Sequence, residues 1–276
     1  RAILPHAAMD RRGCEYSGYC GSYGCSSGAK GSSRAALLNH AVKTGNCTIL
    51  ANAKVVKLES NQKGDVVAVN YFDENNIKKS VTAKTYVVAC QAIETSRLLL
   101  ASTGPKHPGG LGNNYNQLGK NIVFSAGGSG TGEMTYSKLE KQMAEALKVR
   151  GPFVNRGLQD WYFIDDKKMG GKAKGGTIDF LLRHPNAISK AKSVKWEDGR
   201  LVWGKELKQK LKSTFTTSQD LRFEVFNDWL PTDNCFVSLD NKVKDKWGSA
   251  VARVRIGYHE HDLKVGEFLS QKALKV

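Results

Sequence analysis

The sequence has no apolar run long enough to cross a membrane, no internal repeat and no low-complexity linker. Its 276 residues are 40% hydrophobic, and no stretch approaches the roughly 18 consecutive apolar residues that a membrane helix needs. Cysteine is also scarce: the chain has six. Six cysteines in a chain of this length are too few for a fold held together by disulfides. These absences leave a globular protein with one large domain or two moderate ones.

Two common binding motifs are missing as well. No C-x2-C pair occurs, whereas zinc ribbons favour such pairs. No G-x-G-x-x-G turn follows an expected strand, although that turn usually holds the phosphates of a dinucleotide. The glycine cluster Gly127–Gly132 is the one tempting candidate. It supplies no apolar helix directly after the glycines, so we do not expect it to bind phosphate.

Positive charge is present in excess, with 42 Lys and Arg against 26 Asp and Glu and a net charge of +16. The basic residues are spread from Lys30 to Lys275 and form no aromatic-interleaved basic block. A solvated basic surface or an acidic protein partner is therefore favoured over nucleic acid.

The stretch Gly13–Leu38 collects half of the cysteines, Cys14, Cys20 and Cys25, among glycines, serines and tyrosines. It has no apolar period, so it is expected to be a loop, followed by a helix from Arg34 to Val42 that Ser32 or Ser33 caps. Disulfides or free thiols, an iron–sulfur cluster and a zinc site all remain open. The isolated Cys47, Cys90 and Cys235 are expected to be buried free thiols.

The alternation of apolar and polar residues predicts short strands before residue 125 and longer ones after it. Strands are expected at 47–50, 53–58, 65–72 and 79–83, then a continuously apolar, buried strand at 84–89 and a helix at 94–101. Later elements are a helix at 138–148, strands at 153–166, 177–183, 221–229, 235–239 and 250–258, a basic helix at 203–211 and a final helix at 262–274. Antiparallel sheet with helices on one side indicates an α+β fold.

KTYVVACQAIETSRLLLAS, at residues 84–102, resembles a segment of the glucose–methanol–choline (GMC) flavin oxidoreductases that usually reads V-x-A-A-G-A-I-x-T-P-R-L-L-L. CGSYGCSSGAKGSS, NCTILANAKVVKLE, HPGGLGNNYNQLGKNIVF and LPTDNCFVSLDNKVKDKWG fit the same family in the same order. The sequence is most similar to the bacterial gluconate- and glucose-dehydrogenase-type members.

The resemblance implies a flavin domain with α/β portions, interleaved in sequence with an antiparallel substrate domain. Residues 1–124 would be part of the FAD-binding domain, 125–258 the substrate domain and 259–276 a return helix to the FAD domain. The family's G-x-G-x-x-G turn and catalytic His segment have no counterpart here, so the chain resembles an internal piece, and the His is expected beyond Val276. His259 and His261 are too few for a metal site and are interpreted as a helix-capping loop.

Six residues are candidate FAD contacts by this resemblance. Val55 and Val56 lie on a strand whose backbone contacts the adenine in the family; the alternative is that they are core valines. Ala89, Cys90 and Gln91 match the A-A-G turn near the flavin nucleotide, with Gln91 in place of the usual Gly, and Thr95 opens the following helix. Arg97, close by, is equally well interpreted as a surface ion-pair partner.

For the cysteine loop, the resemblance implies a [3Fe–4S] cluster on Cys14, Cys20 and Cys25, although each gap is one residue wider than in such relatives. The implied function is FAD-dependent oxidation of the CH–OH group of a sugar, sugar acid or other alcohol. Electrons would pass to a haem protein or quinone, and a periplasmic or membrane-associated location is implied. Two alternatives are an iron–sulfur electron-transfer subunit and a basic module for an anionic partner.

Overall fold

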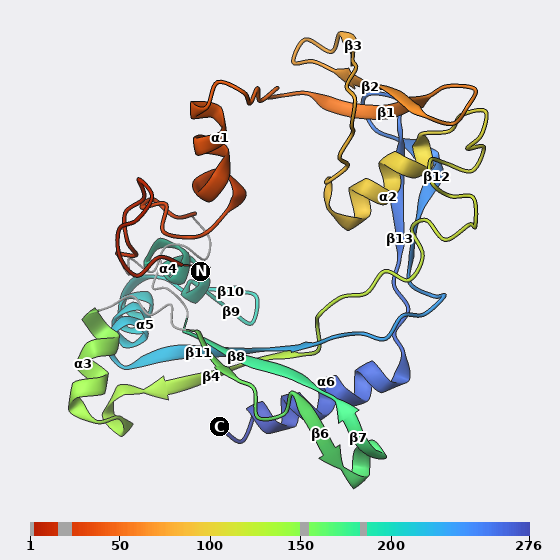
Figure 1. The fold of residues 1–276 in the computed structure, drawn as a ribbon. Helices are drawn as coiled ribbons and strands as arrows, with labels where there is room; N and C mark the ends of the chain where they lie inside the picture. Colours follow the sequence, from red (N-terminus) through yellow and green to blue (C-terminus); the bar gives the residue numbers. More distant parts are fainter. Residues whose placement is uncertain (1–2, 16–23, 150–154, 183–186) are drawn as a thin grey trace. The chain divides into compact units, whose positions relative to one another are not determined.

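The computed structural model describes residues 3–15, 24–149, 155–182 and 187–276 (Figure 1). The chain forms two compact units. Unit 1 comprises Arg1–Thr48, Ala126–Asn227 and Lys264–Val276, and unit 2 comprises Ile49–Ser125 and Asp228–Leu263. Both are built from helices and antiparallel sheet, which is a mixed α+β architecture. In the described ranges, no helix is long and apolar enough to cross a membrane.

Unit 2 opens with a three-stranded meander in the order β1-β2-β3, formed by Lys54–Ser60, Val66–Phe72 and Lys78–Val81. The turn before β3 is built by Asp73, whose Oδ1 accepts the backbone N–H groups of Asn75 and Ile77, both at 2.9 Å. Asn76 takes a positive φ of 59° there, which asparagine tolerates better than most residues. The predicted meander is confirmed.

Helix α2 (Gln91–Ala101) packs against β1 and against the hairpin of β12 (Phe236–Lys244) and β13 (Ala250–Arg255). The loop at 107–124 reaches the same hairpin, where the Val237 N–H donates to the Gly119 carbonyl at 2.7 Å. A Cβ at residue 119 would lie 2.3 Å from the Val237 carbonyl oxygen, and φ there is +79°. Only glycine fits this close approach.

The buried strand predicted at 84–89 is wrong. These residues form no strand, and the Val87 side chain is 87% exposed. A continuously apolar strand needs hydrogen-bonded neighbours and cover on both faces, and none of the described strands pairs with it. The segment is held through Tyr86, whose hydroxyl donates to the Val67 carbonyl at 2.8 Å. The strand expected at 47–50 is likewise absent.

Unit 1 contains an antiparallel sheet in the order β4-β11-β8-β5. Its strands are Ser129–Thr135, Ser218–Asn227, Gly176–Leu182 and Asn155–Leu158. Val265, Leu269 and Ala273, on the part of α6 (Glu260–Ala273) that belongs to this unit, share a buried cluster with Ile178, Phe223 and Val225. The predicted strand at 221–229 is found as β11, and its alternating residues Phe223 and Val225 face the core. The glycine cluster at 127–132 runs into β4 and makes no phosphate turn.

The remaining elements of unit 1 are helices and two-stranded hairpins. They are η1 (Arg34–Leu38), α1 (Asn39–Lys43), η2 (Tyr136–Lys138), α3 (Lys141–Val149), β6 (Phe163–Asp166), η3 (Lys167–Met169), β7 (Gly171–Lys174), α4 (Ala187–Val194), β9 (Trp196–Glu197), β10 (Arg200–Leu201) and α5 (Gly204–Thr216). The Ser32 Oγ accepts the Ala35 N–H at 3.1 Å, which confirms the predicted helix cap. The single strand expected over 153–166 is instead two strands, β5 and β6, separated by a turn.

The units do not divide the chain as the predicted domains do. The division at Ser125 lies next to the expected start of the substrate domain, but Asp228–Leu263 groups with Ile49–Ser125 and the first 48 residues group with unit 1. Compactness alone says nothing of what each unit binds, so the assignment of flavin and substrate domains stays a prediction.

Candidate functional site

The first candidate feature is a β-bulge on β1. Its pairing with β2 passes from Val55–Tyr71 directly to Lys57–Asn70, so Val56 has no partner in the ladder. β1 is also the edge strand of its sheet. A bulge residue on an edge strand keeps backbone groups that the sheet does not use. Val56 therefore stands outside the hydrogen-bonded ladder of its sheet.

Val55 and Val56 face α2 across a narrow crevice of about 20 Å³. The crevice is lined by Lys54, Val55, Val56, Glu94, Arg97, Leu98, Ala101 and Ser249. Its volume is close to that of a single water molecule. The crevice itself is thus too small for a nucleotide, and a ligand of that size would have to lie along its rim.

At the N-terminus of α2 the chain supplies its own hydrogen-bond partners. The Thr95 Oγ1 accepts the Cys90 N–H at 3.0 Å, and the Gln91 Oε1 accepts the Ile93 N–H at 2.9 Å. These bonds satisfy two donors that a helix otherwise leaves unpaired. Gln91 has φ of +72°, the left-handed region that glycine adopts without steric cost. The position at which the resembling segment has Gly is therefore left-handed here, with Gln occupying it.

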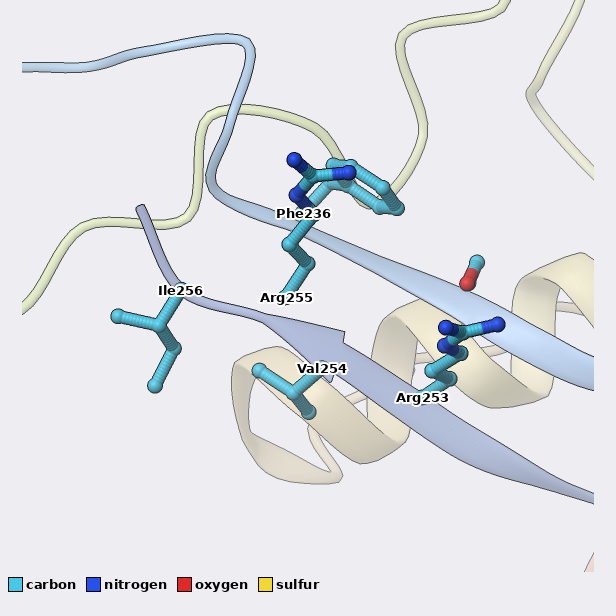
Figure 2. Close-up of a pocket in the computed structure, with 6 residues that line it drawn as sticks. Phe236, Arg253, Val254, Arg255 and Ile256 are labelled. Carbon is cyan, nitrogen blue, oxygen red and sulfur yellow. The ribbon is translucent and has the colours of Figure 1, made fainter. Parts of the chain in front are cut away.

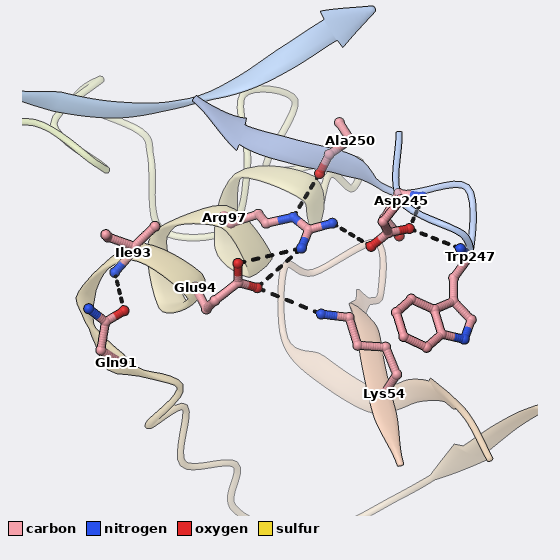
Figure 3. A network of polar contacts seen from close by, with 9 residues as sticks. Lys54, Gln91, Ile93, Glu94, Arg97, Asp245, Trp247 and Ala250 are labelled. Atoms are coloured by element: carbon pink, nitrogen blue, oxygen red, sulfur yellow. Dashed lines mark hydrogen bonds and ion pairs between the residues drawn. The ribbon is translucent and has the colours of Figure 1, made fainter. Parts of the chain in front are cut away.

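Arg97, on α2, is the centre of a polar network that connects this helix to β1 and to the β12–β13 hairpin (Figure 3). Its Nε donates to the Ala250 carbonyl at 2.7 Å, and its Nη2 lies 2.6 Å from Asp245 Oδ2. Its Nη1 contacts Glu94 at 3.2 Å, and Lys54 approaches the same carboxylate at 3.7 Å. Arg97 is only 9% exposed. The ion-pair interpretation of Arg97 is confirmed, but its surface location was wrong.

Asp245 closes the network from the β12–β13 turn. Burial by itself raises the pKa of Asp245, but hydrogen bonds from Arg97, Ser249 and Trp247 outweigh it, so the pKa lies below the ordinary 3.8. The Trp247 ring lies under two ammonium groups, Lys246 at 4.4 Å and Lys54 at 5.6 Å. The network therefore joins β1, α2 and the hairpin through charged groups.

The structure places the predicted FAD contacts on two neighbouring elements, β1 and the N-terminal end of α2. Ala89 precedes the helix and is exposed. Sequence reasoning missed Lys54 and Asp245. The spacing of Glu94 and Arg97 on one helix face signals an ion pair, but the Arg97–Asp245 contact spans 148 residues and leaves no local signal.

The cysteine loop is only partly described, because Cys20 lies in residues 16–23, outside the described ranges. Cys14 and Cys25 are free thiols. The Ser27 hydroxyl, 3.5 Å from the Cys25 sulfur, and the Lys30 N–H, at 3.4 Å, lower the pKa of Cys25 to about 7. The described residues include no group of three or more His, Cys, Asp or Glu that could hold a metal.

The other sulfur and imidazole predictions have mixed outcomes. Cys235 is buried and its thiol donates to the Gly257 carbonyl at 3.0 Å, as expected of a structural thiol. Cys90 is exposed and Cys47 half-buried, so burial was wrong for Cys90. His259 Nδ1 accepts the His261 N–H at 3.1 Å at the start of α6, which confirms the capping interpretation.

Comparisons with known proteins place part of the chain in a known family. Residues 4–124 match the family model described as GMC oxidoreductase. The chain is 29% identical over 170 residues to paromamine 6'-oxidase of Streptomyces fradiae, covering 61% of this chain and 31% of that protein. It is 30% identical over 163 residues to 6'''-hydroxyparomomycin C oxidase of Streptomyces lividus, covering 59% and 29%. It is 33% identical over 79 residues to the fructose dehydrogenase large subunit of Gluconobacter japonicus, covering 29% and 14%.

The matched region contains the meander, the Val56 bulge and α2, and the relatives are named as oxidases and a dehydrogenase. The chain is similar to the GMC oxidoreductases over residues 4–124, a little less than half of its length. It spans about a third, or less, of the length of these curated relatives.

Proposed function

We propose that this chain is part of an FAD-dependent oxidoreductase that oxidises the CH–OH group of a sugar, sugar acid or other alcohol, with electrons passing to an acceptor other than NAD. The observation that carries the proposal is the bulge at Val56, an unpaired backbone position on an edge strand beside α2, within the family-matched residues. The similarity to a paromamine oxidase and a fructose dehydrogenase supports the substrate class.

The backbone of Val55 and Val56 would hold the adenine end of the flavin nucleotide along the rim of the crevice. Edge-strand amides and carbonyls recognise a base by hydrogen bonds that place no demand on the side chains. The turn at Ala89, Cys90 and Gln91 would approach the nucleotide from the N-terminus of α2, and Thr95 would hold that turn in place. FAD, when bound, supplies the acceptor for the hydride leaving the alcohol carbon.

The described residues fit the nucleotide at β1 and are less suited to it at α2. The N–H groups of Cys90 and Ile93 are already bonded to Thr95 and Gln91. Glu94 adds a carboxylate to the first turn of the helix, where a phosphate would otherwise be favoured. We therefore propose that α2 contacts a neutral part of the nucleotide. The phosphates would be bound by residues other than those of α2.

The remaining parts of the proposal concern the substrate domain and the cysteine loop. The β4-β11-β8-β5 sheet lies within residues 125–258, which we assign to substrate binding. The [3Fe–4S] cluster gains no support from the described thiols, and Cys20 lies outside them, so no electron-transfer step is derived through it. No residue of this chain is assigned as the catalytic base.

Variants at Val56 in the protein expressed from the full reading frame test the adenine contact. Val56→Pro removes one backbone N–H, which an edge-strand bulge accommodates, and Val56→Ile keeps it. We expect Val56→Pro to purify folded, by circular dichroism, and to bind FAD about two- to tenfold more weakly than wild type, since a lost neutral hydrogen bond costs about 0.5–1.5 kcal/mol. Val56→Ile should bind FAD as wild type does. Equal affinity in both variants would remove Val56 from the site.

A further inference from the structure

The β12–β13 hairpin has two chemically different faces. Register pairs Val237 with Val254; Val237 is buried in unit 2, whereas Val254 is 37% exposed. The neighbouring pairs, Phe236 with Arg255 and Ser238 with Arg253, lie on the opposite face because side chains alternate along a strand. That outer face combines an aromatic ring, a hydroxyl and two guanidinium groups.

A cavity of about 510 Å³ opens on this hairpin, lined by Phe236, Ser238, Arg253, Val254, Arg255 and Ile256. Figure 2 shows the Arg255 guanidinium over the Phe236 ring, at 5.9 Å from its centroid, with Arg253 on the same side of the hairpin. The volume lies in the range of small-molecule sites. Stacking on the ring holds the Arg255 fork in one orientation.

The guanidinium groups of Arg253 and Arg255 form no ion pair with a carboxylate of the described residues. Among the described residues neither Arg253 nor Arg255 has an ion-pair partner within reach, although the buried Arg97 has two. Asp240 is the nearby acid: the N–H groups of Val243 and Lys242 lower its pKa most, and Arg253 adds a smaller attraction. The Asp240 Oδ1 is bonded to those two backbone groups, at 2.9 and 2.8 Å, rather than to Arg253.

We propose that this cavity binds a small organic oxyanion, a carboxylate or phosphate group carried on a ring. The oxyanion would be held by Arg253 and Arg255, which suit planar, two-point recognition of such groups, with the Ser238 hydroxyl as a further donor. The ring would lie against Phe236. The site lies within residues 125–258, which are assigned to substrate binding, but it uses none of the residues assigned to the flavin, so its test does not depend on the flavin contacts.

Calorimetric titration of the 276-residue chain tests the site with phenyl phosphate, benzoate and inorganic phosphate, at ionic strength held constant with sodium chloride. We expect phenyl phosphate and benzoate to bind, and inorganic phosphate to bind about tenfold more weakly than phenyl phosphate because it lacks the ring. Arg253→Gln and Arg255→Gln should each weaken both organic anions by about tenfold. Phe236→Leu should weaken phenyl phosphate more than it weakens inorganic phosphate.

Lys242→Gln is the matched control, because it removes one exposed positive charge from the same strand without touching the cavity. It should bind the anions as wild type does. If Lys242→Gln weakens binding as much as the arginine variants, the attraction is general to the basic surface and the proposal is overturned. It is also overturned if no anion binds, or if Arg253→Gln and Arg255→Gln, shown folded by circular dichroism, bind as wild type does.

Discussion

The Nη2 atom of Arg97 lies 2.6 Å from the Oδ2 atom of Asp245, across 148 residues of sequence. Both side chains are largely buried, at 11% and 15% exposure. This contact ties the helix at the candidate flavin site to the turn between β12 and β13. It makes the geometry of unit 2 depend on two segments that lie far apart in the chain.

Replacement of Arg97 with Met is expected to lower the free energy of unfolding by about 3 kcal/mol. The change leaves the Asp245 carboxylate buried without its partner, and an uncompensated buried charge is strongly destabilising. Urea denaturation followed by circular dichroism measures the loss.

The control for this variant is Arg222→Met, which removes an arginine from a more exposed pair with Glu224. A pair of that kind is worth about 1 kcal/mol or less. If the two variants lose the same stability, Arg97 is an ordinary surface charge and the network does not hold unit 2 together.

Stability should depend on pH through Asp245. Because its pKa in the folded protein lies below the ordinary 3.8, the unfolded chain takes up a proton first as the pH falls. The stabilisation is therefore complete above about pH 5 and is lost as the pH falls below 4 towards the folded pKa. The difference in unfolding free energy between wild type and Asp245→Asn should shrink over that interval. A difference that stays constant from pH 6 to about pH 2.5 would contradict the lowered pKa.

At Gln91, glycine should be preferred to alanine. The backbone there is left-handed, which costs a residue with a Cβ about 1 kcal/mol relative to glycine. Gln91→Gly should therefore be more stable than Gln91→Ala by about 1 kcal/mol in urea unfolding. At Ser96, inside α2, the order should reverse, with alanine more stable than glycine. Alanine equal to or better than glycine at both positions would exclude the left-handed turn.

Alkylation of Cys25 should report its hydrogen bond to Ser27. With a pKa of about 7, roughly half of the Cys25 thiol is ionised at neutral pH. Ser27→Ala removes the largest cause of the lowered pKa, so iodoacetamide should label Cys25 a few-fold more slowly at pH 7, as measured by peptide mass spectrometry. Ser26→Ala is the matched control and should label at the wild-type rate. Equal rates in all three proteins would show that Ser27 does not stabilise the thiolate.

Local patterns predicted the parts of the fold that local physics decides. The meander follows from alternation and the turn chemistry of Asp73, the Ser32 cap from its position before an apolar helix, and the β11 core face from its period of two. The turn between β9 and β10 is likewise local, because Asp198 and Gly199 both take positive φ there.

The sequence predictions failed where the structure depends on residues far away in the chain. The apolar run at 84–89 carries strand propensity, yet no described strand pairs with it, and Val87 stays exposed. Arg97 looks like a surface charge until Asp245 is brought to it. The bulge at Val56 depends on the register with β2, which residue types do not specify. The family resemblance pointed to Val56, but the reason its backbone is available came only from the structure.

The most direct test of the proposed function compares flavin in two proteins, the 276-residue chain and the product of the full reading frame. The chain has no G-x-G-x-x-G turn to hold the phosphates, so it should purify without stoichiometric FAD. The longer protein should carry FAD, and its yellow flavin absorbance should bleach when a sugar alcohol substrate is added without oxygen. A longer protein that folds, carries no flavin and shows no bleaching with any of a panel of sugars, sugar acids and simple alcohols would contradict the account.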